Sequence, residues 1–418
     1  MRQLHNNLSF LKHLLVRLKI AFIFLLIICC TLKSFAADMT IVPSIYLKNE
    51  YDDNVGFRSH SIEDDFLISI MPSLTYDYAT ERIGLHSKGS IDFQRYASKT
   101  YDETENINFE FGGKALLNER FRFNADLSYL KDTTLESELQ ETGIITTRQN
   151  RKRYTGTGGL TYNINEDSSL GMDFKHQETY YDGKSVDYKH DTVTLNYIKQ
   201  LPDLKNVITV KPYYEKYCSD VNDIDNYGVY LGWNHMFTRT LSMSAFLGGR
   251  YTESLYKYDI HMGDVRDFRL PYPYLRPIII KVEESDHNIN GLADISVEKT
   301  GEIYSILLGF NYDLGYSANG YPITTTKGYF EYTMRLSERL NVQLKTEVYS
   351  NKSDDPNSKE DSRHLNIMPV LNYRLTENYN LQLGNSYALH KDMNASNNSG
   401  YDRNRIWIGL TFNFPDKL

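Results

Sequence analysis

The feature that most constrains the fold is a strict alternation of apolar and mixed side chains near the end of the chain. In residues 405–414, RIWIGLTFNF, Ile406 and Ile408 fall on one side, and Arg405 and Trp407 fall on the other. A period of two is that of a β-strand, whose successive side chains point to opposite faces of the sheet. The same pattern recurs in RFRFNADLSYL, LNVQLKTEVY and TLSMSAFLGGRY. These stretches predict a protein built from strands with one apolar face.

The connections between the alternating stretches are of two kinds. Short turns are expected at residues 79–82, 117–120, 164–168, 200–205, 237–240, 300–302, 337–340 and 376–379. Longer polar links are expected at 49–65, 131–150, 253–288, 317–326, 351–363 and 391–401, with intermediate ones at 98–103 and 181–187. The short turns join about 16 strands, and a strand near residues 40–48 together with the final strand raises the number to about 18.

An even number of antiparallel strands, with short turns at one rim and long loops at the other, is typical of bacterial outer-membrane barrels. We therefore predict an all-β fold, a single antiparallel transmembrane up-and-down β-barrel of about 18 strands, with 16 as the alternative. Its apolar face would meet lipid and its mixed face would line the lumen, the reverse of a soluble sandwich. The short turns would be periplasmic and the long loops extracellular.

The start of the chain has the order of a secretory signal peptide. Basic residues such as Arg2 and Lys12 precede an apolar run at residues 20–30, and small residues follow at Ser34 and Ala36. The run is too short for a permanent membrane anchor, which needs about 20 residues. We expect residues 1–36 to be a cleaved signal peptide and residues 37–418 to form the barrel.

The charge and cysteine content of residues 37–418 exclude some kinds of partner and bond. With 41 basic against 54 acidic residues the net charge is −13, and nucleic acid is not an expected partner because its binding requires a basic surface. Cys218 is the one cysteine after residue 36, which leaves no internal disulfide. No cofactor is expected, and the scattered histidines show no metal-ligand spacing.

Three N-terminal stretches, LKNEYDDNVGF, DDFLISIMPSLTYDY and ERIGLHSKGSIDFQRY, resemble the putative β-barrel porin-2 family, over roughly residues 40–130. The resemblance implies an outer-membrane barrel tied to exopolysaccharide systems, hence a passage for a secreted sugar polymer, and it transfers no catalytic residue. The final strand also resembles the C-terminal recognition signal of such proteins, with Gly409, Phe412 and Phe414 at the motif positions. The implied partners are the barrel-assembly machinery, outer-membrane lipid with lipopolysaccharide, and a polysaccharide.

Charged side chains on the mixed faces are the candidates for the lumen wall. Both signs occur, often two residues apart on one strand, and such a lumen would filter polar solutes by charge and size. The candidates are Lys88, Asp92, Arg122, Asp126, Asp173, Lys175, Lys345, Glu347, Arg403 and Arg405. Tyr213, Tyr217 and Tyr349 on the same faces are candidates for stacking against sugar rings, although such charges and aromatics also occur in any wide barrel simply because water and interfaces are there.

The longest link contains RLPYPYLRPIII, which is proline-rich and therefore stiff and extended. Pro271, Tyr272, Pro273, Tyr274 and Arg276 are the candidates for an inward-folded constriction, and a surface loop with a short hairpin is the alternative. No compact Ser, His and acidic motif is present, so an enzyme is not expected. Three functions remain: a passive water-filled channel for an exported exopolysaccharide, a general or solute-specific uptake porin, and a closed structural or adhesive barrel.

Overall fold

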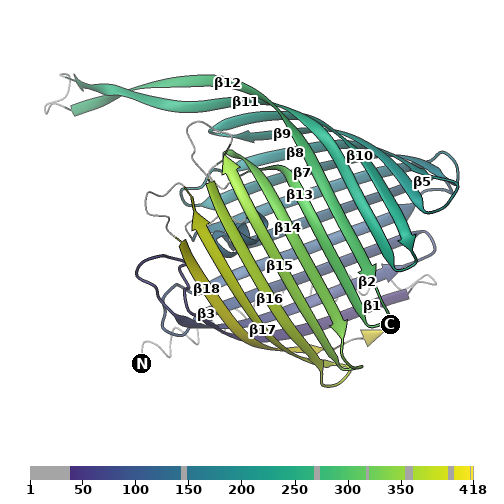
Figure 1. Ribbon diagram of the computed structural model, residues 1–418. Helices are drawn as coiled ribbons and strands as arrows, with labels where there is room; N and C mark the ends of the chain where they lie inside the picture. Colours follow the sequence, from purple (N-terminus) through teal and green to yellow (C-terminus); the bar gives the residue numbers. More distant parts are fainter. Residues whose placement is uncertain are drawn as a thin grey trace.

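The computed structural model describes residues 38–142, 148–267, 274–316, 320–353, 361–393, 400–414 and 416–417. The expected signal peptide, residues 1–36, lies outside the described residues. The chain forms a closed antiparallel barrel of 18 strands with a short helix and one additional two-residue strand (Figure 1). The predicted fold and strand number are confirmed.

The strands of the wall follow one another around the barrel in chain order. They are β1 (Asp38–Asp52), β2 (Asp65–Ala79), β3 (Ile83–Tyr96), β4 (Thr104–Leu116), β5 (Phe121–Thr133), β6 (Asn150–Asn163), β7 (Ser168–Asp182), β8 (Tyr188–Gln200), β9 (Asn206–Ser219), β10 (Asn222–Thr238), β11 (Leu241–Asp267), β12 (Tyr274–Thr300), β13 (Tyr304–Tyr316), β14 (Pro322–Arg335), β15 (Leu340–Ser353), β16 (Asp361–Arg374), β17 (Tyr379–Asp392) and β18 (Gly400–Asn413). The helix is α2 (Thr134–Thr142), and the additional strand is β19 (Asp416–Lys417).

The final strand closes the barrel onto the first strand. β18 pairs with β1 from Ser44 opposite Asn413 to Asp52 opposite Arg405, and β1 pairs with β2 on its other side. Every strand of the wall therefore has two neighbours, so its backbone N–H and C=O groups are paired within the sheet and no edge faces hydrocarbon. β19 extends this seam, because Asp416 and Lys417 pair with the start of β1.

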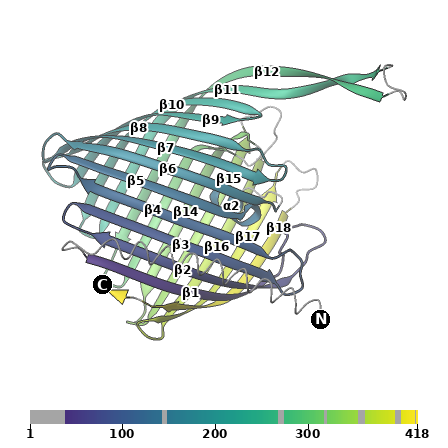
Figure 2. The same ribbon diagram turned by 180° about the vertical axis from the view of Figure 1, so that it is seen from behind.

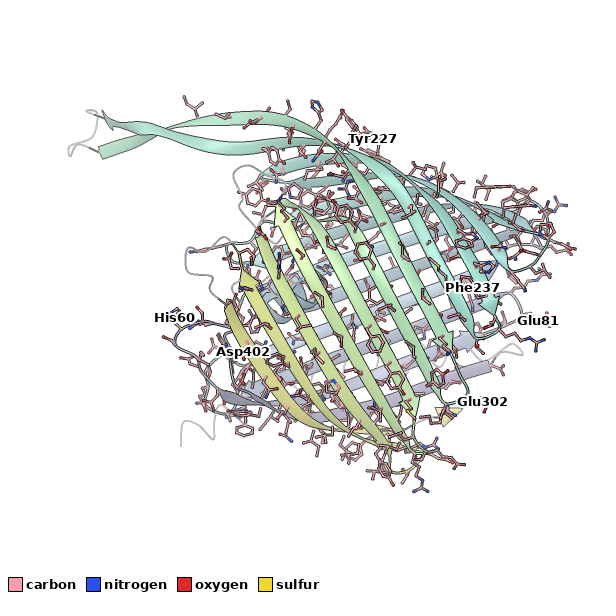
Figure 3. All side chains as sticks on the ribbon, viewed as in Figure 1. His60, Glu81, Tyr227, Phe237, Glu302 and Asp402 are labelled. Carbon is pink, nitrogen blue, oxygen red and sulfur yellow. The ribbon has the colours of Figure 1, made fainter. Side chains whose placement is uncertain are left out.

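The alternation read from the sequence becomes a lipid-type outer face and a polar inner face. Ile406 and Ile408 of β18 are about half exposed on the outside, at 47% and 50%. Arg403, on the opposite face of the same strand, is buried inside. The two rims are marked in Figure 3, where Glu81 and Glu302 lie in short turns and His60 lies in a long link at the other end. We call these ends the short-turn rim and the loop rim.

The connections match the expected division into short turns and long links, with three differences, of which one is helix α2 in the link expected at 131–150. β9 and β10 are joined at the loop rim by residues 220–221 alone, a tight turn that the sequence pattern did not distinguish from continuous strand. Residues 253–288, expected to be a link, are largely strand. The reason is that β11 and β12 stay paired from Leu241 opposite Lys299 out to Asp267 opposite Tyr274. Among the described residues, no helix is long and apolar enough to cross a membrane.

The extra length of β11 and β12 forms a ribbon that projects past the loop rim, away from the barrel (Figures 1 and 2). Tyr274 and Arg276 pair with Asp267 and Val265 at its far end. The expected inward constriction is therefore wrong for Tyr274 and Arg276, because continued cross-strand pairing carries them outward. Pro271, Tyr272 and Pro273 lie outside the described residues.

Candidate functional site: a lumen closed at the loop rim

The contact between Arg151 and α2 shows which face of β6 is turned toward the lumen, and the pairing of the strands extends this assignment to the rest of the wall. Arg151 of β6 binds α2 inside the barrel, and directly opposed residues of paired strands share a face. Extending this rule around the wall places all ten sequence-predicted lumen residues on the inner face: Lys88, Asp92, Arg122, Asp126, Asp173, Lys175, Lys345, Glu347, Arg403 and Arg405. Whether they select solutes stays a prediction.

These ten residues divide between two different halves of the lumen. In the half near the short-turn rim, Lys88, Arg122, Asp126 and Asp173 are exposed to solvent. In the half near the loop rim, Arg403 is 2% and Glu347 is 4% exposed. The lumen is therefore an open vestibule at one end and a packed interior at the other.

Helix α2 accounts for much of this packing. It follows β5 directly and lies inside the barrel (Figure 2). There Leu135 forms a buried cluster with Phe57 and Ala388, against which Tyr401 packs. Ala388 and Tyr401 belong to β17 and β18, so the helix joins β5 to strands that lie six and five positions away around the barrel. We call α2 together with residues 53–64, which link β1 to β2, the lumen plug.

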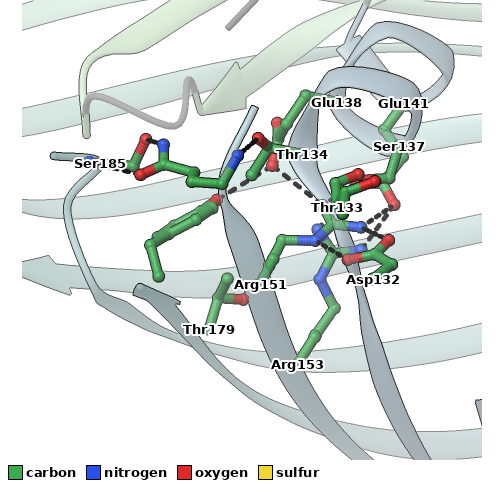
Figure 4. Close-up of polar contacts among 12 residues, drawn as sticks. Asp132, Thr133, Thr134, Ser137, Glu138, Glu141, Arg151, Arg153, Thr179 and Ser185 are labelled. Carbon is green, nitrogen blue, oxygen red and sulfur yellow. Dashed lines mark hydrogen bonds and ion pairs between the residues drawn. The ribbon is translucent and has the colours of Figure 1, made fainter. Parts of the chain in front are cut away.

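A buried guanidinium ties α2 to the wall. Arg151 is fully buried and donates to Asp132 Oδ2 at 2.7 Å, to Glu138 Oε1 at 2.9 Å and to Glu141 Oε2 at 3.0 Å. Arg153 forms a second, bidentate pair with Glu141, at 2.8 and 2.7 Å (Figure 4). We call these five residues, Asp132, Glu138, Glu141, Arg151 and Arg153, the latch. Removing one partner of such a network leaves the others buried and uncompensated, so the latch holds α2 firmly against the wall.

The two glutamates of the latch differ in their environment. Burial raises the pKa of Glu138, against the opposing effect of Arg151, and Tyr181 donates a hydrogen bond to the same carboxylate at 3.0 Å. Burial also acts to raise the pKa of Glu141, but the hydrogen bonds and charges of Arg153 and Arg151 outweigh it, so its pKa is lowered. Glu141 therefore holds the latch as an anion, whereas the charge of Glu138 is costly.

The second part of the plug begins at a buried ion pair at the barrel seam, because Asp52, which binds Arg403, also accepts a hydrogen bond from the backbone N–H of Asn54 at 3.0 Å. Arg403 and Asp52 are each 2% exposed, and Nε of Arg403 donates to both carboxylate oxygens, at 3.0 and 2.9 Å. Phe57 adopts a positive φ of 51°, which is costly for a bulky residue, and its ring packs edge-on against Tyr401 at 5.0 Å. The tertiary contacts of the ring hold that backbone conformation in place.

The tyrosines of the inner face are part of the packed half. Tyr217 and Tyr349 are 0% and 1% exposed. Tyr217 stacks on Tyr188 and on Tyr316, with ring centroids 5.1 and 4.1 Å apart, so both of its faces are covered by other rings. Tyr217 therefore offers no free face to a sugar ring in this state, contrary to the expectation from the sequence.

Sequence reasoning missed α2 because it lies in a link expected to be a loop. A signal was present at its start, where Thr133 is followed by Glu136 in the spacing of a capping box. What the sequence could not provide is the location of the helix, since a short polar helix outside the barrel would carry the same pattern. Among the described residues, no group of three His, Cys, Asp or Glu side chains is placed to hold a metal ion.

Neutralising the two latch glutamates should have unequal effects at neutral pH. Glu141→Gln removes the anion held by two arginines, and we expect the population with α2 detached from the wall, measured by backbone hydrogen exchange of α2, to rise about tenfold, since charge-assisted hydrogen bonds are worth about 1.5–3 kcal/mol and Glu141 is partly exposed. Glu138→Gln is the matched control: it removes a charge that burial disfavours, keeps an oxygen that can accept from Arg151 and Tyr181, and leaves Asp132 and Glu141 to compensate Arg151, so it should change little.

The same pair predicts how attachment of α2 depends on pH in the wild-type protein. A lowered pKa contributes stability that is lost as pH falls through it, so hydrogen exchange of α2 should stay slow down to pH 4.5, the ordinary pKa of glutamate, and should accelerate only below that pH. Glu141→Gln should lack this acid transition. Equal exchange of α2 in the two variants at neutral pH would contradict the assignment of Glu141 as the latch anion.

The closed 18-strand wall, with an apolar exterior and a polar interior, defines the fold class of outer-membrane β-barrels. Among solved structures, the ferric citrate transporter FecA has a TM-score of 0.50 at 9% identity, covering 90% of this chain and 79% of that chain. The ferric-catecholate receptor Fiu of E. coli scores 0.49 at 8% identity, covering 91% and 82%. OpdK of Pseudomonas aeruginosa scores 0.44 at 10% identity, covering 90% and 99%.

These likenesses concern the fold alone. The sequence matches no family model and no curated protein. The resemblance to the porin-2 family therefore stays a prediction, as do the assembly machinery, lipopolysaccharide and polysaccharide as partners.

Proposed function

We propose that this protein is a non-enzymatic bacterial outer-membrane channel for polar solutes, closed at the loop rim by the lumen plug and open toward the periplasm at the short-turn rim. The observation that carries the proposal is the two-part lumen. Exposed charges of both signs, among them Lys88 and Asp126, line a vestibule that runs up to a packed plug. Barrels of 16–18 strands leave an aqueous channel unless something fills it.

The finer proposal is passage of an exported exopolysaccharide. Two points support it: the resemblance of residues 40–130 to a family tied to such polymers, and a vestibule that is open on the side from which an exported polymer would arrive. Uptake of small solutes by the same channel is the alternative, and direction is decided by transport measurements across sided vesicles. The long loops, on this proposal, are extracellular and contact lipopolysaccharide.

A closed structural or adhesive barrel is the second candidate. It is favoured by the fully buried contact of the plug with Arg151 of the wall, and by the projecting ribbon of β11 and β12, to which the channel proposal assigns no role. The two candidates differ in whether the plug ever moves. Purified protein in a planar bilayer should show small, fluctuating conductance if it is a gated channel and none if it is a structural barrel.

Charge reversal tests whether ions pass along the inner face. Arg122→Glu and Lys345→Glu change inward side chains and should shift the reversal potential toward cation selectivity under a salt gradient. Lys131→Glu is the matched control, because Lys131 lies on the outer face of β5 near the loop rim. Equal shifts for all three variants would show that ions do not follow the inner face.

A further inference from the structure

The vestibule contains a groove to which the proposed function assigns no role. A hollow of about 680 Å³ lies against the inner wall of β2 to β6, where Asp77, Glu110 and Asp126 line it. A second hollow of about 550 Å³, lined by Arg82 and Arg122, reaches the short-turn rim. The two share the lining residues Ala79, Gly84, Lys114 and Asn124 and therefore form one continuous groove.

Glycines at inward positions make the groove. Gly112 lies opposite Asp126, and a Cβ there would come within 2.6 Å of the carboxylate. Gly84 lies opposite Lys114, and a Cβ there would come within 2.8 Å of the lysine side chain. Glycine weakens a strand, so two at the same place lower its local stability. Because these glycines have no side chain, the charged side chains of Asp126 and Lys114 lie flat over them against the wall and leave space toward the lumen.

The groups in the groove are balanced in charge and in hydrogen bonding. Glu110 and Asp126 accept hydrogen bonds, Lys114 and Arg122 donate them, and Asn124 does both. Asp77 is already paired with His86, with Oδ1 and Nδ1 2.6 Å apart. Glu110 and Asp126 each accept one hydrogen bond, from Asn108 at 2.8 Å and from Thr157 at 3.2 Å, and a carboxylate can accept more than one. A solute of strong single charge gains little here, because each attraction meets an opposing charge nearby. Hydroxyl groups, which donate and accept, fit such a lining.

We infer that this groove binds a segment of an uncharged, polyhydroxylated chain, a neutral glycan, that enters from the short-turn rim. The inference rests on the proposed function for the access of the chain to that rim. The groove is elongated and open at one end, as a polymer requires. With hydrogen bonds and no buried ion pair to the ligand, binding is weak, with Kd on the order of 1 mM, which suits a passage that must also release its solute.

The test is saturation-transfer NMR of maltoheptaose with the full protein in lauryldimethylamine oxide, a detergent without a sugar headgroup. Maltoheptaose should bind at least fivefold more tightly than oligomers of glucuronate or of glucosamine. Gly112→Val, which fills the groove, should abolish the signal. Gly158→Val is the matched control, because Gly158 faces outward with open space around it, and it should bind like wild type.

Asp126→Asn is a second groove variant, which keeps the test informative if Gly112→Val does not fold. It preserves the shape of the groove and should weaken binding severalfold. Each variant is first checked for heat-modifiable migration, the property of an intact barrel. Tighter binding of a charged oligomer, undiminished binding by both groove variants, or no saturable signal from maltoheptaose with wild type would overturn the inference. Binding measured this way needs no conductance, so a barrel that conducts without binding refutes the groove, and one that binds without conducting refutes the channel.

Discussion

Replacing residues 134–149 by an Asn-Gly turn is expected to raise single-channel conductance severalfold, toward that of an unplugged barrel of this strand number. Thr133 and Asn150 are the last paired residues of β5 and β6, so a two-residue turn closes the hairpin without changing the wall. The deletion removes α2 and with it the contacts of Leu135 across the lumen and two of the carboxylates bound to Arg151. The measurement is current through single proteins in a planar bilayer.

The matched control shortens the projecting ribbon by the same kind of turn. Tyr256 and Glu284 are paired in β11 and β12, and joining them by Asn-Gly removes residues 257–283, the segment in which the sequence alone predicted the constriction. This variant should conduct like wild type. An increase in conductance on shortening the ribbon, with none on deleting α2, would show that the plug identified in the structure does not limit passage.

Replacing Arg403 by Met should release residues 53–64 from the lumen. The substitution leaves the Asp52 carboxylate buried without its guanidinium, which costs about 3–5 kcal/mol when one partner of a buried pair is removed. Backbone hydrogen exchange in residues 53–64 should accelerate by roughly two to four powers of ten, while exchange in the strands of the wall stays slow.

Arg405 provides the matched control two residues away on the same face. Its side chain is 16% exposed against 2% for Arg403, and it lies 3.9 Å from a carboxylate oxygen of Glu50, so its charge is less deeply buried and Arg405→Met should change exchange less. Adding Asp52→Asn to Arg403→Met should recover part of the loss, because the orphaned charge disappears. Unchanged exchange in Arg403→Met would mean that the ion pair does not hold this link.

The barrel wall was predictable because the alternation of apolar and polar residues lies within each strand's own sequence. The alternation around Arg122 and Asp126 assigns one face to water and the other to lipid, and the structure places both side chains inward without any long-range information being needed. The turns were predictable for the same reason, since they interrupt the alternation over a few residues. The tight β9–β10 connection was missed because residues 220–221 interrupt it too briefly.

The state of the lumen was not predictable, because it depends on residues far apart in the chain. Arg403 was identified as a lumen residue, but nothing near it in sequence indicates that Asp52, 351 positions earlier, would bury it at the seam. Leu135 sits in a polar link, and only the curvature of the closed wall brings Ala388 and Phe57 within its reach.

The sequence by itself thus determined the strands, their faces and their number. Adjacent side chains of a strand point to opposite faces, and along every strand one face favours apolar residues toward lipid and the other favours polar residues toward the lumen. The tertiary structure alone decided which link turns inward and which projects outward. Links at 131–150 and 253–288 are both long and polar in the sequence, yet one ends as a helix latched by Arg151 and the other as a ribbon. Their different courses arise because burial of α2 satisfies a guanidinium on the inner wall, whereas β11 and β12 satisfy their own backbone by continued pairing.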